Sequence, residues 1–427
     1  MSRTRSSICR VDGQEIRLNL KPLDEGTKSF RIVSRDDGGR ITGSSTPKYH
    51  NGKVLVEEDG EKEATGDAHG EEPDKDEGLF DRYGFRCAEG DTGSSFHRSA
   101  EVSDTIAKKR REKEASRLLK WSEMLSAFKS TQPSKVEAAL AKLKERTRKG
   151  IPNDRRGEAW YYICGAKEVL KEIPDPEACM TGSDGKCVVP ARTLDEIERD
   201  IDRTYPAHRL FRTKDSKEET SKQKSLRKVL RWYAAVDPEV GYCQGMGFLA
   251  GLFLLYMDEL SAFQCFYKAM QMKSEITLRD LYLPQMVEAQ RVLFVFKKLG
   301  RQHLPRLWIH LEAQQLDPTM YATEWAMTMF CRGFHFDLVT RVMDIYLNEG
   351  YKVVFRVMLA LMKNVEETLI SSSFEQIMDT LRKIPELTDV NVIMDIAYNI
   401  RVKRADISKY AAEYDGMKRE ERKSLRL

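Results

Sequence analysis

The segment IERDIDRTYP, residues 197–206, carries an arginine whose setting suits chemistry on a charged group. On a helix, Ile197 and Ile201 share a buried face, and Asp200 lies one turn before Arg203, close enough to hydrogen-bond its guanidinium. Pro206 ends that helix and leaves Arg203 at a rim, where it can project toward a partner. A guanidinium remains charged on desolvation and presents several donors in one plane. On spacing alone, an ordinary ion pair on a solvated helix face is the alternative.

A second segment, VGYCQGMG at 240–247, combines three glycines with a glutamine. The glycines permit a tight backbone that another group can approach closely. They flank Gln244, whose amide offers both a donor and an acceptor. The alternative is a loop whose glycines serve helix packing and whose glutamine caps the next helix.

A third feature follows the tripeptide Gly150-Ile151-Pro152, where Arg156 and Trp160 stand four residues apart. On a helix this spacing lets the guanidinium lie over the indole, a contact that is structural more often than functional. We therefore expect this pair to brace a neighbouring site.

Sequence signatures of a self-contained enzyme are absent. No GxxxxGK[ST], HExxH or GxSxG motif occurs, and no GxGxxG follows a strand. The seven histidines are scattered, and His303 with His310 lacks a carboxylate or thiol partner at ligand spacing. We expect neither a metal site nor a cofactor held by this chain.

Charge and cysteine usage indicate a soluble cytoplasmic protein. Lys and Arg number 71 against 67 for Asp and Glu, and a net charge of +4 implies no sequence-wide attraction to nucleic acid. The basic run 108–111 could bind phosphate, but Glu112 and Glu114 follow it, so we expect a solvated face. The eight cysteines contain no CxxC pair, which indicates reduced thiols. The N-terminus lacks an apolar signal core, and the longest charge-free apolar stretch, 241–257, is too short to span a bilayer.

Helical periodicity dominates the chain from residue 103 onwards, and no alternating strand pattern interrupts it. Pro and Gly residues separate the periodic segments. We predict an all-α protein with a dozen or more helices in two lobes. The predicted parts are a helical lead-in at 105–148, the main domain at 149–370, C-terminal helices at 371–415 and a charged tail at 416–427.

The first hundred residues have a different composition. Residues 31–104 are rich in Gly, Ser, Asp and Glu, and the stretch 51–77 holds 11 acidic residues against 3 basic ones. Such a segment cannot bury enough apolar surface to offset its ordering entropy, so 1–104 is predicted to be mostly disordered. The exception is the aromatic peptide LFDRYGF at 79–85, which we expect to dock on the folded part as a strap.

Together the motifs resemble the TBC domain, the GTPase-activating module for Rab GTPases. GIP followed by Arg156 and Trp160 is similar to the family's opening motif, IERDIDRTYP to its IxxDxxR motif and GYCQG to its YxQ motif. The C-terminal half is similar at Asp317-Pro318, Tyr321, Trp325, Phe330 and 342–350, although Met343-Asp344 stands where the family often has Trp-Asp. The resemblance covers about 148–370.

The resemblance implies a protein that accelerates GTP hydrolysis by a Rab partner in its GTP form and so regulates vesicle traffic. The partner carries GTP and Mg²⁺, and this chain supplies an arginine finger at Arg203 and a glutamine finger at Gln244. The other implied roles are preorganisation of Arg203 by Asp200, loop shape and GTPase contact by Tyr242, Thr204, Gly241 and Gly245, and structural bracing by Arg156, Trp160, Ile197 and Pro206.

The alternative function is a catalytically silent scaffold that binds a GTPase or a cortical partner. Retention of both Arg203 and Gln244 argues against it, because a scaffold has no physical need for two fingers. The segments LLKWSEMLSAF, GYKVVFRVMLALMK and DRYGF are similar to a TBC subfamily of cortical Rab regulators tied to ezrin-type scaffolds. That similarity implies a cortical scaffold partner and transient membrane contact through the GTPase, whereas the ending Leu425-Arg426-Leu427 is only weakly of the PDZ-binding type.

Overall fold

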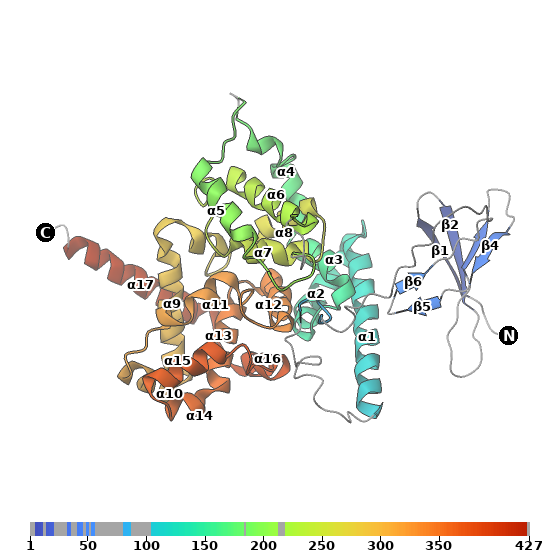
Figure 1. Cartoon of the computed structure of the whole chain (residues 1–427). Helices are drawn as coiled ribbons and strands as arrows, with labels where there is room; N and C mark the ends of the chain where they lie inside the picture. Colours follow the sequence, from blue (N-terminus) through green and yellow to red (C-terminus); the bar gives the residue numbers. More distant parts are fainter. Residues whose placement is uncertain are drawn as a thin grey trace. The chain divides into compact units, whose positions relative to one another are not determined.

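The computed structural model divides the chain into two units, Met1–Lys75 and Asp76–Leu427 (Figure 1). In the first unit the structure describes the backbone of six short strands between residues 5 and 55. In the second it describes residues 80–86, 104–182, 185–211 and 218–424, with side chains except at 104–111 and 421–424.

The described strands of the first unit form three antiparallel hairpins. They are β1 (Arg5–Val11) with β2 (Gln14–Leu20), β3 (Ile32–Arg35) with β4 (Ile41–Ser45), and β5 (Lys48–His50) with β6 (Lys53–Leu55). These hairpins differ from the disorder predicted over 1–104. The prediction gave no weight to Ile16, Leu18 and Leu20, which alternate with polar residues, or to Asp12-Gly13, a favoured two-residue hairpin connection. Most of the acidic stretch lies outside the described residues.

Seventeen α-helices make up the described part of the second unit, which confirms the all-α prediction there. The first eight are α1 (Asp104–Phe128), α2 (Pro133–Lys149), α3 (Asn153–Ile163), α4 (Val169–Glu172), α5 (Ala191–Ile201), α6 (Ser221–Val236), α7 (Met246–Leu254) and α8 (Glu259–Gln271). The others are α9 (Val287–His303), α10 (Pro305–Ala313), α11 (Thr323–Thr328), α12 (Phe336–Glu349), α13 (Lys352–Asn364), α14 (Glu366–Ile370), α15 (Phe374–Lys383), α16 (Val390–Asn399) and α17 (Arg404–Ser424). Short 3-10 turns are η1 (Ala166–Glu168), η2 (Ala178–Met180), η3 (Leu278–Tyr282), η4 (Pro284–Met286) and η5 (Pro318–Met320).

The helices of this unit gather in two groups (Figure 1). In one, α6 packs against α5, α7 and α8, and α7 also contacts α8. In the other, α13 packs against α9, α12 and α16, while α10 contacts α14. Because α5 and α7 both belong to the first group, the two polar segments singled out in the sequence lie in the same group of helices.

Two glycines set the start of α7, which begins at Met246 because Gly241 and Gly245 have φ of +57° and +103° and interrupt the helical backbone. One helix boundary differs from the sequence expectation. The segment predicted as a separate tail from 416 continues α17 to Ser424. Its sequence MKREERKS is composed largely of strong helix formers, which accounts for the continuation.

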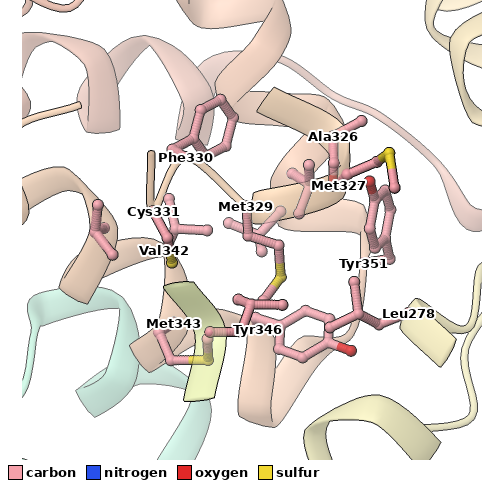
Figure 2. Packing of buried hydrophobic residues seen from close by; sticks show 14 of the residues in the cluster. Leu278, Ala326, Met327, Met329, Phe330, Cys331, Val342, Met343, Tyr346 and Tyr351 are labelled. Carbon is pink, nitrogen blue, oxygen red and sulfur yellow. Dashed lines mark hydrogen bonds between the residues drawn. The ribbon is translucent and has the colours of Figure 1, made fainter. Parts of the chain in front are cut away.

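The apolar faces of these helices form a common core. Figure 2 shows part of it, with Met329, Phe330 and Cys331 close to residues of α12. Met343, at the position where the family often has tryptophan, belongs to this cluster and is 1% exposed. A flexible thioether fills an irregular gap readily, so this departure affects packing only. None of the described helices is long and apolar enough to cross a bilayer.

Candidate functional site

Arg203 and Gln244 stand at the ends of two helices that contact each other. Arg203 follows the last turn of α5, and its backbone N–H donates to the carbonyl of Asp200 at 3.2 Å. Gln244 is exposed and lies two residues before α7. Since α5 and α7 are in contact, the fold brings the two predicted finger segments together.

A buried carboxylate faces the exposed guanidinium of Arg203. The side chain of Arg203 is 66% exposed, and its Nη1 lies 3.7 Å from Oδ1 of Asp200, which is 7% exposed as a residue. At that distance the contact is an ion pair, not the hydrogen bond that the sequence spacing suggested. The arginine is therefore held loosely and remains available to a partner.

Tyr242 fixes the other oxygen of the same carboxylate. Its hydroxyl donates to Oδ2 of Asp200 at 2.7 Å, and the tyrosine is 8% exposed. Burial, followed by the hydrogen bond to Asp200, raises the pKa of Tyr242 well above its usual value. This bond joins the loop before α7 to the last turn of α5.

The glycines of the second segment allow the start of α7 to pack closely against the segment after α5 and against α11. A Cβ on Gly247 would lie 2.7 Å from the hydroxyl oxygen of Thr204, and one on Gly245 would lie 3.3 Å from Thr328. Thr204 in turn donates its hydroxyl to the carbonyl of Asp200 at 2.9 Å. The packing role considered for these glycines is therefore present, but the capping role considered for Gln244 is not, because Gly245 occupies the N-cap position of α7.

Arg156 and Trp160 brace this region through a carboxylate that the sequence analysis did not single out. Nε of Arg156 and Nε1 of Trp160 donate to Oδ1 of Asp344 at 3.1 and 2.8 Å, and the Ile151 N–H donates to Oδ2 at 3.0 Å. The guanidinium lies over the ring of Tyr256, 5.5 Å from its centroid, instead of over the indole as proposed from the sequence. Asp344 is the one charged residue within the apolar run VMDIYL, and that isolation was the available signal.

Electrostatics keep the guanidinium of this cluster charged. Burial opposes the charged form of Arg156, but attraction to Asp344 outweighs it and raises the pKa of the guanidinium. Both groups are buried, Arg156 at 4% and Asp344 at 0% exposure. A buried pair of this kind is strongly destabilised when one partner is removed. The cluster therefore rigidly joins α3 to α12.

Ile197 and Pro206 take structural places around the site. Ile197 is fully buried in α5, and Pro206 follows Tyr205 in the segment beyond the helix. Residues 80–86, which include the described part of the strap predicted at 79–85, lie on this same segment: the Arg86 N–H donates to the carbonyl of Ala207 at 2.9 Å. Among residues with described side chains, no group of His, Cys, Asp and Glu is arranged to hold a metal ion.

Comparison with known proteins identifies relatives of this helical region. A family model described as the Rab-GTPase-TBC domain matches residues 153–370. A human protein named Ecotropic viral integration site 5 protein homolog is 32% identical over 333 residues, which cover 77% of this chain and 38% of that protein. Mouse TBC1 domain family member 10B is 31% identical over 315 residues, covering 72% of this chain and 36% of that protein. The chain thus spans little more than a third of the length of these relatives.

Solved structures with the same fold are also found. The TBC domain of a Chlamydomonas flagellar RabGAP gives a TM-score of 0.55 at 24% identity and covers 75% of this chain and 99% of that one. The Ypt/Rab-GAP domain of Gyp1p gives a TM-score of 0.51 at 19% identity, covering 64% of this chain and 93% of that one. At these identities the likeness shows the fold.

Proposed function

Because the chain belongs to the Rab-GTPase-TBC domain family, we propose that it accelerates GTP hydrolysis by a Rab GTPase that carries GTP and Mg²⁺. The observation that carries this proposal is the pairing of an exposed Arg203 with a buried Asp200, on a segment packed against the Gln244 loop. The chain contributes two side chains to a reaction whose nucleotide belongs to the partner.

Arg203 acts on the charge that develops during phosphoryl transfer. The transferring group spreads negative charge over its oxygens, and a GTPase alone neutralises this charge poorly. An arginine supplied from another protein raises the rate by about 10³ to 10⁵, equivalent to roughly 4 to 7 kcal/mol of barrier. The loose 3.7 Å pairing with Asp200 orients the guanidinium while leaving its donors free for phosphate oxygens.

Gln244 orients the attacking water in this proposal. Its amide combines a donor and an acceptor, which lets it hold a water by one atom and the GTPase by the other. The side chain is exposed, and the loop that carries it is pinned through Tyr242. We further propose that the protein works in the cytoplasm, meets its lipid-anchored partner at a membrane surface and is assisted there by a cortical scaffold.

Removal of either finger residue, Arg203 or Gln244, should slow GTP hydrolysis by the Rab. Phosphate release from a panel of GTP-loaded Rabs is measured with wild type, Arg203→Ala, Arg203→Lys and Gln244→Ala, at matched helicity by circular dichroism. On the responding Rab we expect the arginine variants to lose about 10³-fold or more in rate and Gln244→Ala to lose on the order of 10²-fold. Arg203→Lys stays nearly inactive because an ammonium cannot reproduce the planar fork.

Two results would count against this proposal. Equal rates for wild type and both finger variants on a responding Rab would exclude the two-finger mechanism. Tight binding of GTP-loaded Rab by wild type without any acceleration would identify the silent scaffold instead.

A further inference from the structure

The segment that follows Arg203 holds a strained residue. Tyr205 has φ of +48°, in the left-handed region that residues with large side chains rarely adopt. It is 4% exposed and lies two residues beyond Arg203. Such a conformation persists only when its surroundings hold it, and the direction of the chain at Arg203 depends on it.

Aromatic rings surround Tyr205 and provide this constraint. Its ring centroid lies 5.6 Å from that of Phe85, 5.8 Å from Phe211, 5.4 Å from Phe248 and 6.0 Å from Phe336. Its hydroxyl donates to the carbonyl of Phe248 at 2.9 Å. We call these four phenylalanines the Tyr205 cage. Phe85 is the only one of them that belongs to the strap.

The strap, residues 80–86, is a compact turn of its own. Oδ1 of Asp81 accepts the N–H groups of Tyr83 and Phe85, both at 2.9 Å, and Phe80 pairs with Arg86 as an antiparallel bridge. Gly84 has φ of +93°, and a Cβ there would lie 3.0 Å from Nε2 of His208. The turn therefore presents Phe85 in a fixed direction and allows a close approach of the two backbones.

Backbone hydrogen bonds attach the strap to the segment after Arg203. The Arg86 N–H donates to the carbonyl of Ala207 at 2.9 Å, and the Arg209 N–H donates to that of Gly84 at 3.0 Å. Nε2 of His208 lies 2.8 Å from the carbonyl oxygen of Tyr83. Residues 207–209 thus gain hydrogen bonds that their own helix group does not supply.

The strap is also anchored to α12. The hydroxyl of Tyr83 donates to Oδ1 of Asp337 at 2.5 Å, and Arg82 forms an ion pair with the same carboxylate. The rings of Tyr83 and Phe336 lie 5.0 Å apart. The strap therefore connects α12, which the Asp344 cluster fixes to α3, with the segment that carries Arg203.

We propose that the strap positions the arginine finger: Phe85 closes the Tyr205 cage, and the bonds of residues 83–86 to 207–209 hold the chain that directs Arg203. Phe85 is a positioning residue, since it touches neither Arg203 nor Gln244 in the described contacts. This inference rests on the proposed function, because its consequence for rate requires that Arg203 act on GTP.

The test compares four forms of the full chain. Phe85→Ala opens the cage, and Phe85→Leu restores apolar bulk. Leu381→Ala, a 3%-exposed residue on α15, serves as a matched core truncation outside the strap contacts. Steady-state kinetics on the responding Rab separate kcat from KM, and amide hydrogen exchange follows the peptide 203–211 without any Rab.

We expect Phe85→Ala to lower kcat by on the order of 10- to 100-fold, because a small misplacement of a catalytic group is costly. Its affinity for a Rab loaded with a non-hydrolysable GTP analogue should change by less than about threefold, because the ring of Phe85 packs against Tyr205 and Phe336 and contacts neither finger. Amides in 203–211 should exchange faster in Phe85→Ala, while Phe85→Leu recovers part of both effects and Leu381→Ala shows neither.

Unchanged exchange of 203–211 in Phe85→Ala would overturn the positioning role whether or not the protein activates a Rab. Faster exchange of 203–211 together with a wild-type kcat would also overturn it, because the segment would then be more mobile without any effect on catalysis by Arg203. A wild type that activates no Rab would contradict the proposed function, and the exchange result would still decide whether the strap orders this segment.

Discussion

At the residue scale, the site depends on one buried carboxylate shared by two elements. Asp200 pairs with the exposed Arg203 through one oxygen and accepts the Tyr242 hydroxyl through the other. A carboxylate that is held on one side cannot follow the guanidinium freely. The orientation of Arg203 should therefore depend on a hydroxyl group that does not touch it.

Tyr242→Phe tests this dependence with the removal of a single atom. The variant leaves Oδ2 of Asp200 buried without its donor, which should cost about 1 to 3 kcal/mol in the free energy of unfolding, measured by urea denaturation. The kcat on the responding Rab should fall by about tenfold, equivalent to ~1.4 kcal/mol of barrier. Tyr267→Phe, a partly exposed tyrosine on α8, is the control and should change neither quantity. Wild-type kcat in Tyr242→Phe would show that Arg203 needs no preorganisation.

Short sequence motifs explain which residues of the site could be predicted from the sequence. Arg203 and Gln244 stand in short motifs whose order along the chain is distinctive, so a single sequence was enough to select them. Asp344 was not selected, because its partners Ile151, Arg156 and Trp160 lie more than 180 residues away and only the fold brings them together. When the partners of a buried charge lie far away in the chain, the residues next to that charge in the sequence do not identify them.

At the element scale, local sequence rules predicted where helices occur better than they predicted where helices end. Helix periods in the second unit correspond to observed helices because apolar faces recur with the helical period. The end of α17 was placed too early, since the charged residues after 415 are mostly good helix formers and the helix continues to Ser424. The strap was singled out by its aromatic residues, but its bonds to 207–209 could not be foreseen because they join segments about 120 residues apart.

The strap is held by a histidine of the segment after Arg203, and protonation of that histidine should weaken the contact in acid. Nε2 of His208 donates to the Tyr83 carbonyl at 2.8 Å, which either form of the ring can do, while Nδ1 accepts the Leu210 N–H at 3.1 Å, which only the neutral ring can do. Burial lowers the pKa of His208 below its usual value of 6.5, partly opposed by the hydrogen bond to Tyr83. A folded-state pKa below the unfolded one gives a stabilisation that is complete above about pH 6.5 and is lost as pH falls through the folded pKa.

We therefore expect wild type to lose more stability between pH 7.5 and 5 than His208→Gln, by up to about 1.4 kcal/mol for each pH unit by which the pKa is lowered. Thermal unfolding at a series of pH values measures the difference, and His310→Gln on α10 controls for the removal of a histidine elsewhere. Parallel pH profiles for wild type and His208→Gln would mean that protonation of this ring is tolerated in the docked strap.

At the scale of the whole molecule, positive and negative charges nearly balance, but they are not evenly paired. Arg279, for example, binds both Asp237 and Glu239. By contrast, a pocket of about 640 Å³ between α1 and α2 is lined by several basic residues, among them Lys113, Arg117, Lys120 and Arg146. None of these four forms an ion pair within the described part of the chain. Burial, and then repulsion from Arg341, lowers the pKa of the half-buried Arg117. The second unit therefore contains a local excess of positive charge at this pocket.

Repulsion between Arg117 and Arg341 should make stability depend on salt. Arg117→Met keeps an apolar stem and removes one charge, so the free energy of unfolding should stay equal or rise by up to about 1 kcal/mol at low ionic strength. Added NaCl screens the repulsion. A rise from about 0.02 to about 0.5 M should stabilise wild type more than the variant, because the Debye length falls from roughly 20 Å to about 4 Å. Arg382→Met, an exposed arginine on α15, is the matched control and should leave the salt dependence of wild type unchanged.

A loss of more than about 1 kcal/mol in Arg117→Met, with the salt dependence of wild type retained, would show that Arg117 stabilises the contact between α1 and α2 through its charge instead of opposing it.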